Sequence, residues 1–141
     1  MKKLTCLIFI GAFIFSSCKK NNEKDCSLSE TNMAAKYKIT AIKYQASATS
    51  PEQDFFDQSL EPCEKDDITS IVADHTYVYS DAGTTCSPNG DYSGTWSLSG
   101  NTLSLDGDPA TLEDFNCTGF SLVVTDIIVP GDKGSIRYTR Q

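Results

Sequence analysis

The sequence predicts an all-β domain, a small antiparallel up-and-down barrel of about eight strands, with a two-sheet β-sandwich as the alternative. From Lys36 onward, short segments rich in Thr, Val, Ile and Tyr alternate with Gly, Asp, Asn and Pro. No segment longer than about ten residues carries apolar residues at the 3.6-residue spacing of an amphipathic helix. Tight turns join most of these segments, which favours sequential antiparallel strands.

The start of the chain has the pattern of a secretory signal. Lys2 and Lys3 precede an uncharged run from Leu4 to Phe15, which is followed by Ser16-Ser17-Cys18. As a helix, this run covers roughly 18 Å, too little for a bilayer core of about 30 Å. The Ser-Ser-Cys sequence resembles the lipobox of bacterial lipoproteins. This resemblance implies that residues 1–17 are a lipoprotein signal peptide and that Cys18 becomes the lipidated N-terminus.

Two further stretches lie outside the expected strands. Residues 18–34 are polar and without periodicity, so we expect the lipidated N-terminus to continue into a flexible tether, and the barrel domain to occupy residues 35–141. The long connection Gln45–Pro62 holds Phe55-Phe56 among acidic residues. We expect it to form a lid, a short helix or an irregular edge.

One predicted hairpin turns at Asp74-His75. Pairing Ala73 with Thr76 gives a ladder that places Val72 opposite Tyr77, Ser70 opposite Tyr79 and Ile68 opposite Asp81. The same register, extended outward, brings Cys63 opposite Cys86. The agreement between the turn and the cysteines supports a Cys63–Cys86 disulfide.

A second predicted hairpin spans Trp96 to Leu105. A two-residue turn at Gly100-Asn101 pairs Ser99 with Thr102, Leu98 with Leu103, and Trp96 with Leu105. One face of this hairpin is then apolar and the other is hydroxylated, as a half-buried hairpin requires. The remaining strands are expected at Lys36–Tyr44, Ala110–Phe115, Phe120–Ile128 and Gly134–Arg140, the last two joined by a turn at Pro130–Gly134.

The six cysteines divide into three groups. Cys6 leaves with the signal peptide, and Cys18 is lipidated. Cys26, Cys63, Cys86 and Cys117 remain, an even number that suits two disulfides in an oxidising compartment. By elimination, Cys26 pairs with Cys117. A zinc site is disfavoured because no two of these cysteines lie within a few residues of each other, and we expect neither a metal nor another cofactor.

The charge of the chain excludes one class of partner. Removal of residues 1–17 lowers the count of Lys and Arg from 12 to 10 while all 19 acidic residues remain, so the net charge falls from −7 to −9. A phosphate backbone is bound by clustered Lys and Arg, so we expect no nucleic acid partner. An anionic lipid surface is also repelled, so membrane attachment is expected through the lipid on Cys18.

The sequence contains no catalytic constellation. It has a single histidine, His75, and lacks both Gly-x-Ser-x-Gly and a glycine-rich phosphate loop. His75 is expected to be an exposed turn residue. We therefore predict that the chain is not an enzyme and has no catalytic residues.

What remains is the interior of the barrel. The predicted registers direct one set of apolar and aromatic side chains toward the barrel axis: Tyr77, Tyr79, Trp96, Leu98, Leu103, Leu105, Phe120, Leu122 and Val124. In an eight-stranded barrel such residues either fill the space or line a cavity for a small ligand. Both alternatives remain open at this point.

Several segments together resemble the lipocalin-like lipoproteins of Bacteroidetes-type bacteria. The resemblance covers roughly residues 33–140 and rests on the lipobox and on these further segments: Lys36-Tyr37-Lys38-Ile39, Cys63-Glu64-Lys65-Asp66-Asp67-Ile68, Ala73-Asp74-His75-Thr76-Tyr77, Cys86 and Gly94-Thr95-Trp96-Ser97-Leu98. Two positions depart from the family pattern. Ala35-Lys36-Tyr37 stands in place of Gly-x-Trp, and His75 takes the place of a turn glycine.

The resemblance implies a lipid-anchored envelope protein that binds a small hydrophobic or amphipathic molecule. We expect a monomer in the cell envelope, at the outer membrane, on the periplasmic face or at the cell surface. The alternative is a non-enzymatic interaction module with a filled core, presenting acidic loops to another envelope protein.

Overall fold

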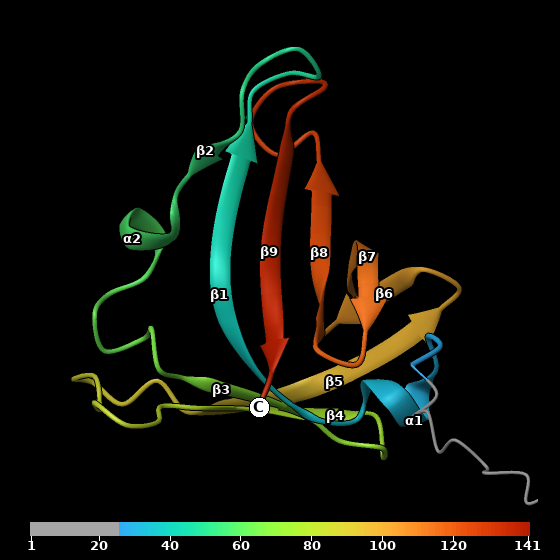
Figure 1. Cartoon of the computed structure of the whole chain (residues 1–141). Helices are drawn as coiled ribbons and strands as arrows, with labels where there is room; N and C mark the ends of the chain where they lie inside the picture. The colour runs from blue at the N-terminus through green and yellow to red at the C-terminus, as the bar shows by residue number, and fades with distance from the viewer. Residues whose placement is uncertain (1–25) are drawn as a thin grey trace, which may run out of the picture.

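The computed structural model describes residues 26–141, which form nine antiparallel strands and two short helices (Figure 1). The elements are α1 (Glu30–Met33), β1 (Lys36–Gln45), β2 (Gln53–Asp54), α2 (Phe56–Ser59), β3 (Ile68–Ile71), β4 (Thr76–Ser80), β5 (Tyr92–Ser99), β6 (Thr102–Leu105), β7 (Asp108–Asn116), β8 (Gly119–Thr125) and β9 (Lys133–Arg140). The expected signal peptide, Cys6 and Cys18 lie outside the described residues. In the described part, neither four-residue helix has the length or the apolar character to span a bilayer.

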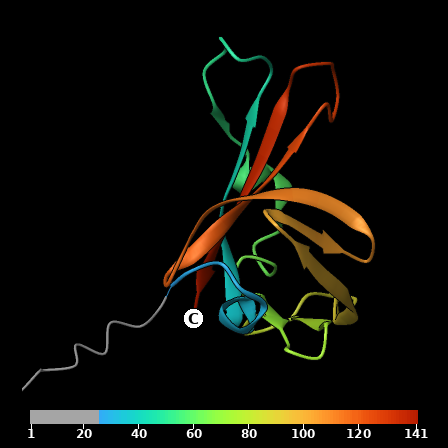
Figure 2. The ribbon, with the colours of Figure 1, turned by 90° about the vertical axis from the view of Figure 1, so that its right-hand side faces the viewer.

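Eight of the strands close into a ring. From β3 to β9 each strand pairs with the next along the chain, β3 also pairs with β1, and β1 pairs with β9. The short β2 pairs with β1 outside the ring. The view in Figure 2 shows β1, β8 and β9 extending beyond the shorter strands. This closure confirms the predicted all-β barrel, in preference to the sandwich.

The end of the ring beside α1 is filled with side chains. Met33 of α1 is fully buried, and the hydroxyl of Tyr37 donates a hydrogen bond of 3.0 Å to its carbonyl. The Tyr37 ring also packs edge-on against Phe120, with 4.9 Å between the centroids. Tyr37 is therefore the aromatic residue at this end of the ring, at the position where the Gly-x-Trp pattern of the family has tryptophan. Because α1 contributes to the core, the folded part begins within the stretch that was expected to be a tether.

The hairpin from Trp96 to Leu105 has the predicted register. Trp96 pairs with Leu105, Leu98 with Leu103 and Ser99 with Thr102. Gly100 has a φ of +57°, the left-handed conformation that this two-residue turn requires. The apolar residues of the pair face the ring interior, where Trp96 and Leu103 are buried.

The register predicted for the β3–β4 hairpin is wrong by one residue. Ile71 pairs with Tyr77, Thr69 with Tyr79 and Ile68 with Ser80, and the turn has three residues rather than two. His75 makes the difference, because its φ of +66° adds a left-handed residue to the turn. Tyr77 and Tyr79 still face inward, but their interior neighbours are Ile71 and Thr69, which are both buried, whereas Val72 is exposed.

Two disulfides hold loops and the N-terminal segment to the ring. The structure joins Cys26 to Cys117 and Cys63 to Cys86, the same two pairs that the sequence suggested. The regular β3–β4 ladder stops at Ile68 and Ser80, so Cys63 and Cys86 meet between two loops and not across paired strands.

Candidate ligand-binding site

An apolar cavity of about 410 Å³ occupies the half of the ring away from α1. It lies among the upper parts of β1, β8 and β9 and the facing residues of β6 and β7. Its aliphatic wall is formed mainly by Ile42, Leu105, Leu122, Val124, Ile127 and Ile136. The cavity therefore offers almost entirely apolar surface to a ligand.

A β-bulge in β1 decides which of its residues reach this cavity. The pairing between β1 and β9 shifts between Ile39 and Ala41. Before the shift Tyr37 and Ile39 face inward, and after it Ile42 and Tyr44 do, since Ile42 lies opposite Ile136 and both line the cavity. A regular strand would have directed Ala41 and Lys43 inward instead.

The loop of residues 126–132 forms one rim of the cavity. The sequence predicted a strand to Ile128, but β8 ends at Thr125. The Asp132 carboxylate organises the loop by accepting hydrogen bonds of 2.7 Å, 2.8 Å and 3.0 Å from the backbone amides of Ile127, Ile128 and Val129. These bonds replace a ladder and turn the chain, which leaves the Ile128 side chain 73% exposed beside the mouth.

Asp132 is itself 1% exposed. Its burial opposes ionisation, but the three amides and the Tyr44 hydroxyl outweigh that effect and hold the pKa of Asp132 below its usual range. The carboxylate therefore stays ionised, as a hydrogen-bond acceptor for the loop. Ile127 packs onto β9 at Gly134, where the Cβ of any other residue would collide with Ile127 Cδ1.

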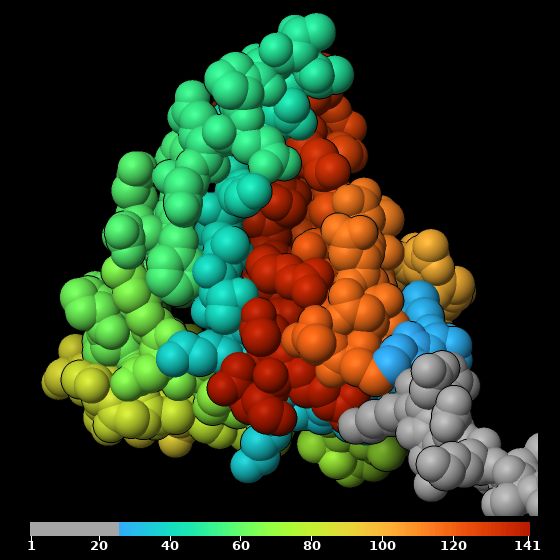
Figure 3. Space-filling view, in the orientation of Figure 1, coloured from blue at the N-terminus to red at the C-terminus, as the bar shows by residue number. Residues whose placement is uncertain are grey.

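The connection between β1 and β3 forms another part of the rim, joined to the first through Tyr44, which contacts both Asp132 and Phe55. It runs along the edge of β1 (Figure 3) and carries β2 and α2, which are labelled in Figure 1. The Phe55 amide donates a hydrogen bond of 2.9 Å to the Ile42 carbonyl, and the Phe55 ring contacts Tyr44 edge-on at 5.9 Å. Phe55 thus lines the cavity, so the short helix that follows it begins at the cavity wall.

A second, polar cavity of about 480 Å³ lies where the ring is least closed. β1 and β3 pair only at Lys36 and Tyr37, which leaves a gap between them. Glu61, Glu64 and Asp67 line the gap from one side, and Tyr79 and Tyr92 line it from the other.

The tyrosines of this polar cavity are ordered by contacts with each other and with Asp67. Their rings stack with 4.9 Å between centroids and 22° between planes. The Tyr79 hydroxyl donates a hydrogen bond of 2.6 Å to Asp67 Oδ2, and the Ala82 amide donates one of 3.0 Å to Asp67 Oδ1. Burial and the hydrogen bond to Asp67 both raise the pKa of Tyr79, so its hydroxyl stays protonated.

Tyr138 of β9 supplies a polar group to the apolar cavity. Its side chain lines the cavity while its ring stacks on Phe120 at 5.1 Å, and the residue is 9% exposed. Among residues 26–141 its hydroxyl has no hydrogen-bond partner. Burial raises the pKa of Tyr138 to about 12, so the group is a neutral hydroxyl able to donate or accept.

The structure separates the predicted interior residues into three groups. Leu105, Leu122 and Val124 line the apolar cavity, and Tyr79 lines the polar one. The other five belong to the filled end of the ring, where Leu98 is partly buried and the rest are buried: Tyr77, Trp96, Leu98, Leu103 and Phe120.

Five cavity residues were not predicted from the sequence. Ile42, Ile136 and Tyr138 lie in strands for which the sequence indicated no register, so their inward direction could not be predicted. Ile127 and Ile128 were expected to continue a strand, whereas they belong to the loop at the rim. Phe55 lies in the connection for which the sequence predicts a lid, a short helix or an irregular edge, and its place in the cavity wall is not evident from the sequence. In the part of the chain that the structure describes, no three His, Cys, Asp or Glu side chains are placed to hold a metal ion.

Comparison with known protein families identifies the family to which the chain belongs. The model of the lipocalin-like domain family matches residues 33–124, from the end of α1 to the cavity-lining part of β8. No curated protein and no solved structure matches the chain. The match leaves out β9, which closes the ring in the structure. A family match over this share of the chain, together with the eight-stranded ring, shows that the protein belongs to the lipocalin-like domain family.

Proposed function

We propose that this protein is a lipid-anchored envelope lipoprotein whose lipocalin-like domain binds a small hydrophobic or amphipathic molecule in the apolar cavity. The observation that carries the binding proposal is the cavity itself, about 410 Å³ of space inside a closed ring. This volume is within the range of small-molecule sites, roughly 300–1,000 Å³. Family membership supports the same kind of function.

The lining of the cavity indicates how binding is driven. Aliphatic side chains surround most of it, so affinity arises mainly from removal of apolar ligand surface from water, about 0.8 kcal/mol for each buried methylene. The Tyr138 hydroxyl is the polar group that orients the ligand. The mechanism is reversible burial with no covalent step.

The alternative is an interaction module with a filled core. The end of the ring beside α1 is filled, which agrees with that idea, but the opposite half is hollow. Phe55 and Phe56, in the long connection after β1, do not offer an exposed apolar surface to a partner, because both are half-buried and Phe55 lines the cavity. The hollow half therefore favours ligand binding.

The binding test uses the neutral fluorescent probe N-phenyl-1-naphthylamine. The ring, its core and both disulfides lie within residues 26–141, so the oxidised chain from Lys19 onward is suitable. We expect saturable binding that Ala110→Phe weakens at least about tenfold by filling the cavity. Ile128→Asp, at the exposed mouth, weakens binding without any demand on core packing.

The matched control is Val78→Phe, which adds similar bulk at a residue 40% exposed on β4 and outside the cavity. It should bind the probe as the unchanged chain does. Equal binding by all four proteins, or no binding by any, would contradict the proposed function.

The anchor is tested separately by labelling with radioactive palmitate in cells. We propose that the full chain incorporates the radioactive palmitate and is recovered in the outer-membrane fraction. Cys18→Ser abolishes both, whereas Cys6→Ser, within the expected signal peptide, leaves both unchanged. Labelling that persists in Cys18→Ser would remove the anchor from the proposal without affecting ligand binding. The two disulfides are consistent with a location outside the cytoplasm.

A further inference from the structure

The polar cavity adjoins the apolar one inside the ring. Ile39, which lines the polar cavity, lies directly opposite Tyr138, which lines the apolar cavity, across the β1–β9 pair. The two cavities have no lining residue in common, but these two neighbouring side chains bring their walls together, and we call this place the junction. A ligand with an apolar part and a polar part can place one in each.

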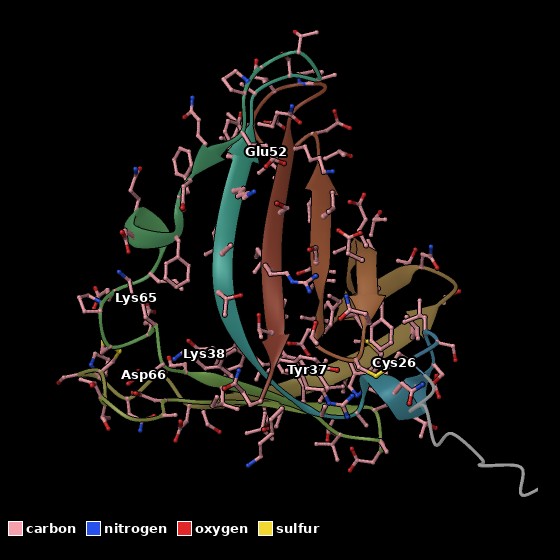
Figure 4. The ribbon with its side chains drawn as sticks, in the orientation of Figure 1. Cys26, Tyr37, Lys38, Glu52, Lys65 and Asp66 are labelled. Atoms are coloured by element: carbon pink, nitrogen blue, oxygen red, sulfur yellow. A yellow bond between two sulfur atoms is a disulfide. The ribbon has the colours of Figure 1, made fainter. Side chains whose placement is uncertain are left out.

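The charged side chains of the polar cavity are all acidic. Glu61, Glu64 and Asp67 line it, and no Lys, Arg or His does so among the residues that the structure describes. Lys65 follows Glu64 in sequence, but its ammonium pairs with Asp57 and lies 5.5 Å from the centre of the Phe56 ring, on the α2 side (Figure 4). The negative charge of the cavity is thus not balanced by a lysine of its own wall.

The hydrogen bonds of these carboxylates leave acceptor capacity for a ligand. Glu64 Oε2 accepts a hydrogen bond of 2.7 Å from the Glu61 amide, and Asp67 is bound by Tyr79 and Ala82. An ionised carboxylate has about four lone-pair sites, so each still has sites to offer. The stacked faces of Tyr79 and Tyr92 add a surface that attracts a cation through the negative face of the ring.

Tyr138 is a second and independent indication of a ligand. Its hydroxyl lacks a partner among the described residues and is accessible from the apolar cavity, although the residue as a whole is only 9% exposed. It lies in the apolar cavity beside the junction with the polar one. A ligand polar group that passes this junction would satisfy it.

We propose that the polar cavity binds the ammonium group of an amphipathic amine whose apolar part occupies the apolar cavity. This inference rests on the proposed function and specifies its ligand class. A fatty acid of the same length would bring its carboxylate against Glu61, Glu64 and Asp67, and like charges brought together in this way are unfavourable. The protein therefore selects cationic over anionic amphiphiles.

The test compares octylamine, octanol and octanoate as displacers of N-phenyl-1-naphthylamine at neutral pH. An alkyl ammonium has a pKa near that of lysine, about 10.4, so the amine is cationic while octanol is neutral. We expect octylamine to displace the probe at least about tenfold more tightly than octanol, and octanoate to be the weakest. The double variant Glu61→Gln, Glu64→Gln should reduce the preference for amine over alcohol at least about fivefold and leave octanol unchanged.

Glu113→Gln is the matched control. It also removes an acidic charge, but from the outer wall of β7, where Glu113 pairs with Lys133. It should keep the full preference for octylamine. Tyr138→Phe should weaken octylamine and octanol together, because both lose the same hydroxyl.

The possible outcomes are distinguishable. If octylamine, octanol and octanoate displace the probe equally, or if Glu113→Gln reduces the preference as much as the double variant, the amine inference is overturned while ligand binding stands. If the probe itself does not bind, the proposed function fails and the amine inference fails with it.

Discussion

The Tyr44 hydroxyl on β1 donates a hydrogen bond of 2.9 Å to the buried Asp132 carboxylate, which organises the loop between β8 and β9. The two residues lie 88 positions apart in sequence. Through this bond the end of β1 is tied to the loop that carries Ile127 and Ile128 at the cavity rim. The shape of the rim therefore depends on one carboxylate.

Asp132→Asn should loosen this rim loop. The amide side chain keeps only one acceptor oxygen, so at least one of the three backbone amides of the loop, or the Tyr44 hydroxyl, loses its partner. We expect hydrogen exchange at Ile127 to Val129 to accelerate by about tenfold or more. Asp74→Asn, in the β3–β4 turn, is the control and should leave these amides protected. Unchanged exchange in Asp132→Asn would show that Asp132 does not hold the loop.

Acid should release the same loop. The pKa of Asp132 in the folded protein lies below its ordinary value of 3.8, so the folded state binds the proton less readily than the unfolded chain. The stabilisation is therefore present above pH 3.8 and is lost as the pH falls through the lower pKa of the folded protein. NMR amide shifts of Ile127 to Val129 should stay constant at higher pH and move only in this acidic window. A transition centred near pH 6 would contradict the assignment.

Two leucines should respond differently to truncation. Leu103 is 1% exposed in the filled end of the ring, so Leu103→Ala should lower the free energy of unfolding by about 2–5 kcal/mol. Leu105 lines the cavity and is only partly buried, so Leu105→Ala should cost less, about 1–2 kcal/mol. Denaturant unfolding measures both values. Equal costs would indicate that the half of the ring around Leu105 is packed.

The two disulfides should contribute unequally to stability. In the chain-entropy model, Cys26–Cys117 closes a loop of 91 residues and Cys63–Cys86 one of 23. Their removal should cost about 4.6 and about 3.4 kcal/mol respectively. Thermal unfolding of the two double Cys→Ser variants tests this order. A larger loss for the Cys63–Cys86 pair would favour contacts in the folded state over loop entropy as the main effect.

The left-handed backbone of His75 should be sensitive to side-chain shape. A β-branched residue fits a φ of +66° poorly, so His75→Val should destabilise the protein by about 1–2 kcal/mol. His75→Asn is the matched variant, since asparagine tolerates this conformation, and it should be nearly neutral. Equal effects of both substitutions would contradict the three-residue turn.

Local sequence patterns predicted much of the fold. The hairpin from Trp96 to Leu105 has the expected register because Gly100-Asn101 fixes a two-residue turn and the apolar alternation fits one face. The β3–β4 hairpin shows the limit of this reasoning. Its polar turn accommodates two or three residues, and only the left-handed His75 in the folded chain decides between them.

The division between core and cavity was less predictable. Trp96, Leu103 and Leu105 all alternate inward on one hairpin, yet Trp96 and Leu103 are buried in the core while Leu105 lines the cavity. Inward direction is a local property of a strand. Whether a side chain meets another across the ring depends on α1, the length of the opposing strands and the bulge in β1.

The sequence by itself determined an all-β domain of sequential antiparallel strands, the residue faces of the hairpin from Trp96 to Leu105 and the number of cysteines left to pair, because alternation, turn chemistry and chain order act over short distances or by counting. The Cys63–Cys86 pair was predicted from a register that the folded chain does not have, since the two cysteines meet between loops. The tertiary structure decided that the ring is filled beside α1 and hollow at the other end. It also placed Tyr138 of the apolar cavity opposite Ile39 of the acidic one. These features arise where strands distant in sequence meet, and one bulge between Ile39 and Ala41 exchanges the inward and outward faces of all that follows in β1.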